Sequence, residues 1–135
     1  MAPGCSARKE SECAWVQSRV LEEIRVVDGF HDHLHDGEAV ARHAQRLRAV
    51  SAELRAMRIH DGPLRLAVEQ YGVSIDRLAG AWVQFADSRR AAHADAGWDA
   101  SAPMGMPVPL QELLSAHAEV MNGARPRISE TCGAR

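Results

Sequence analysis

Apolar residues recur at spacings of three and four along most of the chain, which is the periodicity of amphipathic helices. The first apolar stripe begins near Glu10 and consists of Cys13, Val16, Val20, Ile24 and Val27. Glycine is a frequent helix stop, so Asp28-Gly29 could end this first helix. Phe30 and Leu34 keep the same spacing. The pattern therefore predicts a helix that either ends at Gly29 or continues toward His35.

A second stripe predicts a helix over residues 38–59. It consists of Val40, Ala44, Leu47, Val50, Leu54 and Met57. Asp36 precedes it and is a suitable N-cap, because its carboxylate can accept hydrogen bonds from the first free backbone N–H groups. The spacing is close to a seven-residue repeat, which favours packing along the whole length of a neighbouring helix. We expect the first two helices to form an antiparallel hairpin.

Glycine and proline divide the rest of the chain. A short third helix is predicted over residues 64–71, with Gly72 as its stop and Ser74 as the cap of a fourth helix over 75–96. The segment 98–109 contains three prolines and a glycine, which predicts a loop. A fifth helix is predicted over 110–121. No alternating strand pattern of useful length occurs, so the predicted fold is an all-α bundle of four to five helices with a long N-terminal antiparallel hairpin.

The length of 135 residues is enough for one domain with one core. We expect a flexible N-terminus over residues 1–9, a single helical domain over 10–122 and a flexible basic tail over 123–135. Aromatic residues make up only 4% of the chain, so Ala, Leu and Val must fill most of the core. These small side chains suit close helix packing.

The formal net charge of -2 argues against a nucleic-acid footprint over the whole domain but leaves local basic faces open. Lys9 is the only lysine. An arginine-rich, lysine-poor composition is typical of GC-rich genomes and indicates a bacterial or mobile-element origin.

The three cysteines are Cys5, Cys13 and Cys132, and their spacing fits no zinc knuckle. We expect reduced thiols in a cytoplasmic protein, with a disulfide between the chain ends as the alternative. The first eleven residues lack the apolar stretch of a signal peptide, and no run is long enough for a membrane span. The expected location is therefore the cytoplasm, without a membrane partner.

Two surfaces are candidates for contact with a partner. The predicted second helix carries an arginine face, and guanidinium groups suit carboxylate or phosphate recognition. The loop 98–109 adds apolar side chains of the kind that anchor interfaces. The candidate partner-binding residues are Arg42, Arg46, Arg55, Arg58, Trp98, Met104 and Met106. A solvated helix face and a loop folded onto the bundle are the ordinary alternatives.

A helix-turn-helix is the alternative interpretation of residues 64–84. The short helix, the Gly72-Val73-Ser74 turn and the following helix have its outline. The candidate DNA-binding residues are Ser74, Arg77 and Gln84. An apolar second helix that opens with Asp76 argues against this interpretation.

A metal-binding bundle or small enzyme is the third interpretation. His31 and His35 are four residues apart and would share a helix face, and His43 is the nearest further ligand in sequence. A polar connection at a hairpin tip explains the same residues without a metal. No cofactor is predicted, since the sequence has neither a glycine-rich phosphate loop nor a nucleophile elbow.

Surfaces without a visible reaction centre favour contact over catalysis. The sequence therefore predicts a small, non-catalytic binding or regulatory protein. Its partner would be another protein or a second copy of the chain, and a nucleic acid is the alternative.

Overall fold

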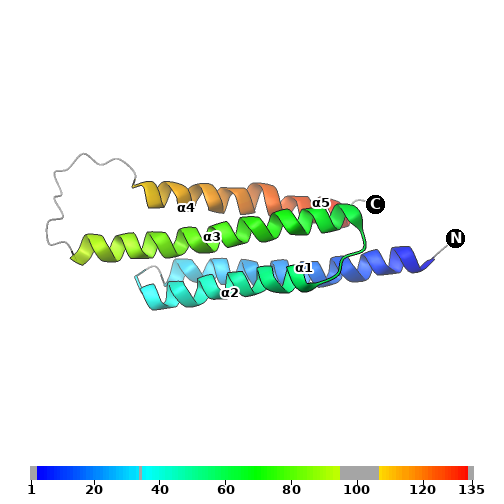
Figure 1. Ribbon diagram of the computed structural model, residues 1–135, viewed down its shortest axis with the longest axis horizontal. Coiled ribbons are helices and arrows are strands. Elements are labelled where there is room, and N and C mark those ends of the chain that lie inside the picture. Colours follow the sequence, from blue (N-terminus) through cyan, green and yellow to red (C-terminus); the bar gives the residue numbers. More distant parts are fainter. Residues whose placement is uncertain (1–2, 34, 95–106, 134–135) are drawn as a thin grey trace.

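Four helical rods lie side by side in the computed structural model, which describes residues 3–33, 35–94 and 107–133 (Figure 1). The first three rods are α1 (Pro3–Asp32), α2 (Gly37–Ala56) and α3 (Gly62–Ala94). The fourth consists of α4 (Val108–Glu119), a π-helical turn η1 (Val120–Ala124) and α5 (Arg125–Gly133) in direct succession. Consecutive rods run in opposite directions, and the described residues contain no strand. The predicted all-α bundle is confirmed.

The predicted N-terminal hairpin is formed by α1 and α2. Asp36 caps α2 as expected, since its Oδ1 accepts hydrogen bonds from the backbone N–H groups of Glu38 and Ala39. Arg19 of α1 forms an ion pair with Glu53 of α2 at 2.7 Å. The ring of Phe30 in α1 meets that of His43 in α2 edge to face. The two helices are therefore joined at two positions along their length.

Gly29 lies inside α1 and does not end it. A Cβ at this position would lie 2.8 Å from Nε2 of His43, so the missing side chain is what allows the histidine ring to approach. The packing of α2 outweighs the low helix propensity of glycine here. The helix ends at Asp32, before His35.

The predicted break between a third and a fourth helix is wrong, because α3 is continuous through Gly72. No glycine in the described residues has a positive φ, so Gly72 does not make a helix stop. It is a close-approach position, where a Cβ would lie 3.3 Å from Oγ of Ser51 in α2. Ser74 is buried and donates to Glu119, and it does not cap a helix. Tertiary packing decides the local structure at both residues.

Both terminal segments are more ordered than the sequence indicated. Helix α1 already begins at Pro3, within the segment expected to be flexible. The expected basic tail is helical as far as Gly133, with Ile128 buried in the core. The burial of Ile128 was not predicted, because charged residues stand close to it in the sequence.

The core is built mainly of aliphatic side chains and alanines, with a few aromatic residues at chosen positions. Phe30 stacks on Trp82 with ring centroids 4.3 Å apart, and Tyr71 is fully buried. The largest apolar side chains without solvent contact are Phe30, Tyr71, Leu47, Leu54, Leu64, Ile75, Leu78 and Ile128. Among the described residues, no helix is both long and apolar enough to cross a membrane.

Candidate binding surface

The predicted arginine face of α2 is divided between two flanks of the helix. At about 3.6 residues per turn, Arg42 and Arg46 lie roughly half a turn away from Arg48 and Arg55. The first flank is on the side of α1, because Glu53 on the same line pairs with Arg19. The second is on the side of α3, where Arg55 donates from Nη2 to Oδ2 of Asp76 at 2.7 Å. Arg58 follows the end of α2.

Arg55 belongs to the packing between α2 and α3 as much as to the surface. Asp76 accepts its hydrogen bond and a second one from Oγ of Ser51, at 3.1 Å. The Ser51 hydroxyl also lies 3.3 Å from the carbonyl oxygen of Gly72. Since its guanidinium already has a carboxylate partner, Arg55 is less available to an external acid than the sequence suggested.

A small crevice lies where α2 ends and α3 begins. Its volume is about 270 Å³, and it is lined by Leu54, Arg55, Met57, Arg58, Ile59, Arg65, Val68 and Glu69. Leu54, Ile59 and Val68 are buried and provide an apolar floor. Arg58 and Arg65 are exposed at the edge. We call this feature the arginine crevice. It can receive an apolar group that lies next to a negatively charged one.

Arg65 was not among the residues predicted from sequence. Asp61 accepts a hydrogen bond from the backbone N–H of Leu64 through Oδ2, and its carbonyl oxygen accepts one from the N–H of Arg65. Asp61 thus caps the first turn of α3, which contains Arg65, and Arg65 lines the same crevice as Arg58. The Asp61-Gly62-Pro63 start signal in the sequence could have indicated this position.

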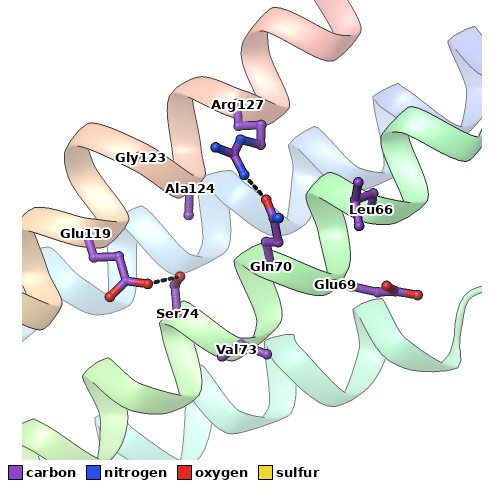
Figure 2. A pocket seen from close by; sticks show the side chains of 9 residues that line it. All are labelled: Leu66, Glu69, Gln70, Val73, Ser74, Glu119, Gly123, Ala124 and Arg127. Atoms are coloured by element: carbon purple, nitrogen blue, oxygen red, sulfur yellow. Dashed lines mark hydrogen bonds between the residues drawn. The ribbon is translucent and has the colours of Figure 1, made fainter.

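A second and larger groove separates α3 from the fourth rod (Figure 2). Its volume is about 470 Å³, and it is lined by Leu66, Glu69, Gln70, Val73, Ser74, Glu119, Gly123, Ala124 and Arg127. Hydrogen bonds from Ser74 to Glu119 and from Arg127 to Gln70 cross it (Figure 2). Its polar groups are therefore largely paired within the chain, in contrast to those of the arginine crevice.

Two of the three residues proposed to read DNA, Ser74 and Arg77, bond α3 to the fourth rod. Arg77 donates from Nε to Glu112 at 2.8 Å, from Nη1 to Glu119 and from Nη2 to Ser115. The hydrogen bond to Glu112, followed by the one to Glu119, raises the pKa of Arg77 above its usual value. Ser74 also donates to Glu119, while Gln84 is exposed. Because α3 has no turn at Gly72, the outline of a helix-turn-helix is absent from residues 64–84.

The histidines proposed as a metal site are dispersed. His31 lies near the end of α1, and its ring is 6.4 Å from that of His117. His35 lies beyond α1 and contacts Arg89 at 3.3 Å from Nδ1. The ring centroids of His43 and His33 are 5.5 Å apart. Burial, followed by the charge of Arg46, lowers the pKa of His43. Within the described residues, no three His, Cys, Asp or Glu side chains are grouped to hold a metal ion.

A buried ionic cluster, which the sequence did not indicate, connects α1, α3 and α5. Glu23 is fully buried, and its Oε1 accepts hydrogen bonds from the Tyr71 hydroxyl at 2.8 Å and from Nε of Arg125 at 2.7 Å. Nη2 of Arg125 donates to the other carboxylate oxygen. Burial, followed by the charge of Glu23, raises the pKa of Tyr71 above its usual value. The buried carboxylate of Glu23 is satisfied by Tyr71 and Arg125, so it offers nothing to an external ligand.

The π-helical turn explains how Arg125 reaches Glu23. The backbone N–H of Arg125 bonds to the carbonyl oxygen of Val120, five residues earlier. One extra residue in this turn changes which side chains of α5 face the core. Burial lowers the pKa of Arg125, but the hydrogen bond and charge of Glu23 outweigh it, so the pKa lies above its usual value.

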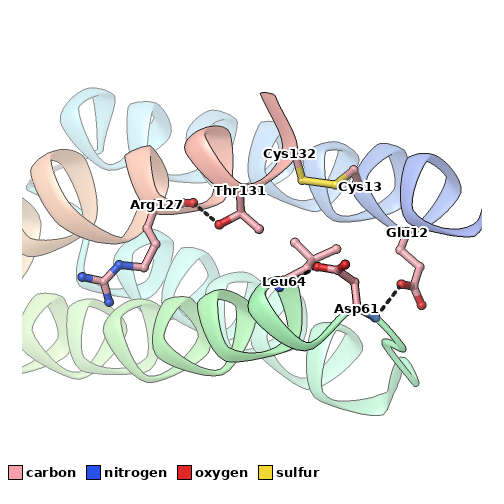
Figure 3. The surroundings of a disulfide bond; sticks show 7 residues. All are labelled: Glu12, Cys13, Asp61, Leu64, Arg127, Thr131 and Cys132. Atoms are coloured by element: carbon pink, nitrogen blue, oxygen red, sulfur yellow. Dashed lines mark hydrogen bonds between the residues drawn. A yellow bond between two sulfur atoms is a disulfide. The ribbon is translucent and has the colours of Figure 1, made fainter. Parts of the chain in front are cut away.

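The cysteines are not all reduced, contrary to the sequence expectation. Cys13 of α1 and Cys132 of α5 form a disulfide with a Cα–Cα distance of 5.7 Å (Figure 3). The predicted alternative of a bridge between the chain ends therefore describes the structure. It could not be chosen from the sequence, because the position of Cys132 depends on the helical fold of the expected tail.

The loop residues Trp98, Met104 and Met106 lie outside the described residues, so their predicted role in partner binding stays a prediction.

Comparisons of the chain with protein-family models, with characterised proteins and with solved structures gave no match. The function is therefore argued from the surfaces alone.

Proposed function

We propose that the chain is a non-catalytic binding protein that recognises an acidic segment of a protein partner at the arginine crevice and the adjoining surface of α2. One observation carries the proposal. Several arginines in the described part of the chain have a guanidinium group without an ion pair or hydrogen bond. All of these except Arg8 lie on α2, just after it or in the first turn of α3. They are Arg42, Arg46, Arg48, Arg58 and Arg65.

The other arginines are occupied within the chain. Arg77 and Arg125 are bound by carboxylates of other helices, and Arg127 donates to Gln70. An unpaired guanidinium keeps its planar set of donors free for a carboxylate, which it can bind with two parallel hydrogen bonds. Two of the unpaired arginines, Arg58 and Arg65, lie beside the apolar floor of the crevice, which supports recognition of an acidic residue next to an apolar one.

An acidic protein segment fits this surface better than a nucleic-acid backbone. The floor of the crevice is apolar and suits the side chain of an apolar residue, which a sugar-phosphate backbone lacks. The chain as a whole carries a formal net charge of -2. A nucleic-acid-binding domain is usually strongly basic as a whole, so this net charge and the apolar floor favour a protein partner.

We further propose the cytoplasm as the location of this activity, as expected from the sequence. Thiol reductants keep most cysteines reduced in that compartment, so the Cys13–Cys132 bond would be one of the transient disulfides that form there.

The test is a fluorescence-anisotropy titration with a short labelled peptide of alternating Glu and Leu. The Arg58→Gln/Arg65→Gln variant removes both unpaired charges at the crevice and should bind about tenfold more weakly, equivalent to about 1.4 kcal/mol. Raising the salt concentration should also weaken binding by the unaltered chain, because exposed charges are screened.

The matched control is Arg25→Gln/Arg90→Gln, which removes two arginines that are 77% and 69% exposed elsewhere on the bundle. It lowers the net charge equally and should leave the affinity unchanged. No binding of the peptide at low salt, or equal weakening by both double variants, would contradict the proposal. Tighter binding of duplex DNA than of the peptide would assign the surface to nucleic acid instead.

A further inference from the structure

The disulfide lies near Asp61 and Leu64, at the end of the bundle where α3 begins (Figure 3). The arginine crevice is lined by residues on both sides of these two in the sequence and so lies at the same end. Cys13 and Cys132 are 119 residues apart in sequence, and their bond ties the start of α1 to the end of α5. Residues 10 and 11, directly before this region, are exposed. These two residues add little burial of their own to hold this part of α1 against α5, and the bond supplies a restraint there.

Glu12, the residue next to Cys13, contacts the connection between α2 and α3. Its Oε2 accepts a hydrogen bond from the backbone N–H of His60 at 2.7 Å and lies 3.3 Å from the His60 ring. Its Oε1 accepts from the backbone N–H of Asp61 at 3.2 Å (Figure 3). Burial raises the pKa of Glu12, but these backbone hydrogen bonds outweigh it, and the pKa lies below its usual value. The carboxylate thus holds the connection in one conformation.

That connection supplies part of the arginine crevice. Arg58 and Ile59 directly precede His60, and both line the crevice. Asp61 caps the first turn of α3 and accepts the backbone hydrogen bond of Arg65, which also lines the crevice. Glu12 therefore links the disulfide to both unpaired arginines of the crevice through contacts within a few residues.

We propose that the Cys13–Cys132 pair is a redox switch for the arginine crevice, and this inference rests on the proposed function. With the bond closed, Glu12 holds Arg58 and Arg65 in the arrangement that binds an acidic segment. With the bond open, the start of α1 separates from α5, Glu12 leaves the connection, and the affinity falls.

The reductant is a dithiol, either a small molecule or a protein. Its first thiolate attacks Sγ of Cys132, because this residue is the more exposed of the two and Cys13 is 7% exposed. The S–S bond breaks, the electron pair leaves with Sγ of Cys13, and that thiolate takes up a proton. The second thiol of the reductant then displaces Cys132 as a thiol. The chain gains two electrons and two protons, and the reductant becomes a disulfide.

The experiment repeats the titration with the Glu-Leu peptide on the oxidised chain, on the chain reduced with dithiothreitol and on the Cys13→Ser/Cys132→Ser variant. The reduced chain and the double variant should bind at least about fivefold more weakly than the oxidised chain, which is the lower end of common coupling between sites. Cys5→Ser is the matched control and should respond to oxidation and reduction as the unaltered chain does.

The Glu12→Gln variant tests the route without opening the bond. In the oxidised state it should reproduce the weaker binding, because an amide cannot accept the two backbone hydrogen bonds with both of its polar groups. Oxidised Glu12→Gln that binds as tightly as the unaltered chain would overturn the role of Glu12.

The remaining outcomes separate the two proposals. Equal affinity in the oxidised and reduced states overturns the switch but leaves the binding function intact. Absence of binding in both states overturns the binding function itself. Loss of the helical circular-dichroism signal on reduction would also overturn the switch, since the bond would then support the whole fold.

Discussion

Arg125 and the arginines of the crevice show two opposite uses of the same side chain. Arg125 lies between helices with 15% of its side chain exposed and donates to Glu23 through two nitrogens. Arg58 and Arg65 lie at the edge of a crevice and have no ion pair in the described part of the chain. The first is enclosed by partners from its own chain, while the others have an apolar surface beside them and no partner.

The comparison shows why arginine content alone says little about binding. A buried guanidinium must be paired, because leaving it unpaired in the interior costs several kcal/mol. An exposed one gains little from a single surface carboxylate, so its pairing is not required for folding. Arginines that remain unpaired and cluster beside an apolar floor are therefore the ones that we assign to recognition.

The largest expected effect is on the buried side of the comparison. Arg125→Ala should lower the free energy of unfolding by about 3–5 kcal/mol, because it leaves the fully buried Glu23 without its counter-charge. Urea unfolding followed by circular dichroism measures the change. Arg127→Ala, two residues along the same helix and exposed, should change stability by less than about 0.5 kcal/mol. Equal losses for the two variants would remove the distinction between them.

A pair of glycines sharpens the contrast between close packing and open surface. Gly29→Ala should lower the free energy of unfolding by about 1–3 kcal/mol, since its Cβ would lie 2.8 Å from Nε2 of His43. Gly80→Ala, also inside a helix, meets nothing within 4 Å and should stabilise the chain by up to about 1 kcal/mol. Stabilisation by both substitutions would show that His43 does not pack against α1 as described.

A smaller effect is expected from pH. Burial, followed by the charges of Arg46, His33 and Arg42, lowers the pKa of His43 below 6.5. Above pH 6.5 the ring is neutral in the folded and unfolded chains, so it contributes nothing to the pH dependence. As the pH falls below 6.5, the unfolded chain binds a proton before the folded one, and stability decreases.

Unfolding free energies at pH 7.5 and 5.5 measure this decrease. His43→Gln should show a smaller loss between the two pH values than the unaltered chain, whatever its absolute stability. His117 has a pKa lowered by burial, followed by the charge of Arg125, so part of the loss should remain in the variant. An unchanged pH dependence would show that His43 is not desolvated.

The helical periodicity was sufficient to predict the bundle and its N-terminal hairpin, because repeated apolar stripes depend only on local sequence. The local stops were misleading. Gly29 was a possible helix end and Gly72 a predicted one, yet each makes room for a side chain of α2. Only the position of the neighbouring helix distinguishes these two meanings of a glycine.

The candidate site was predicted only in part, because it also depends on which helices are neighbours. Arg58, named from the sequence, lines the crevice, but Arg55 is paired with Asp76, a residue 21 positions away. The Glu23–Arg125 pair spans 102 residues and depends on a π-helical turn. Contacts between residues so far apart produce no regular spacing in the sequence from which they could be predicted.

The central claim is that Arg58 and Arg65 recognise negative charge. Its most direct test is the affinity of an Arg58→Glu/Arg65→Glu variant for two labelled peptides, one alternating Glu and Leu and the other alternating Lys and Leu. The fold should tolerate the change, because both residues are exposed and unpaired in the described part of the chain. We predict that the unaltered chain prefers the acidic peptide and that the variant prefers the basic one. A variant that still prefers the acidic peptide would contradict the account.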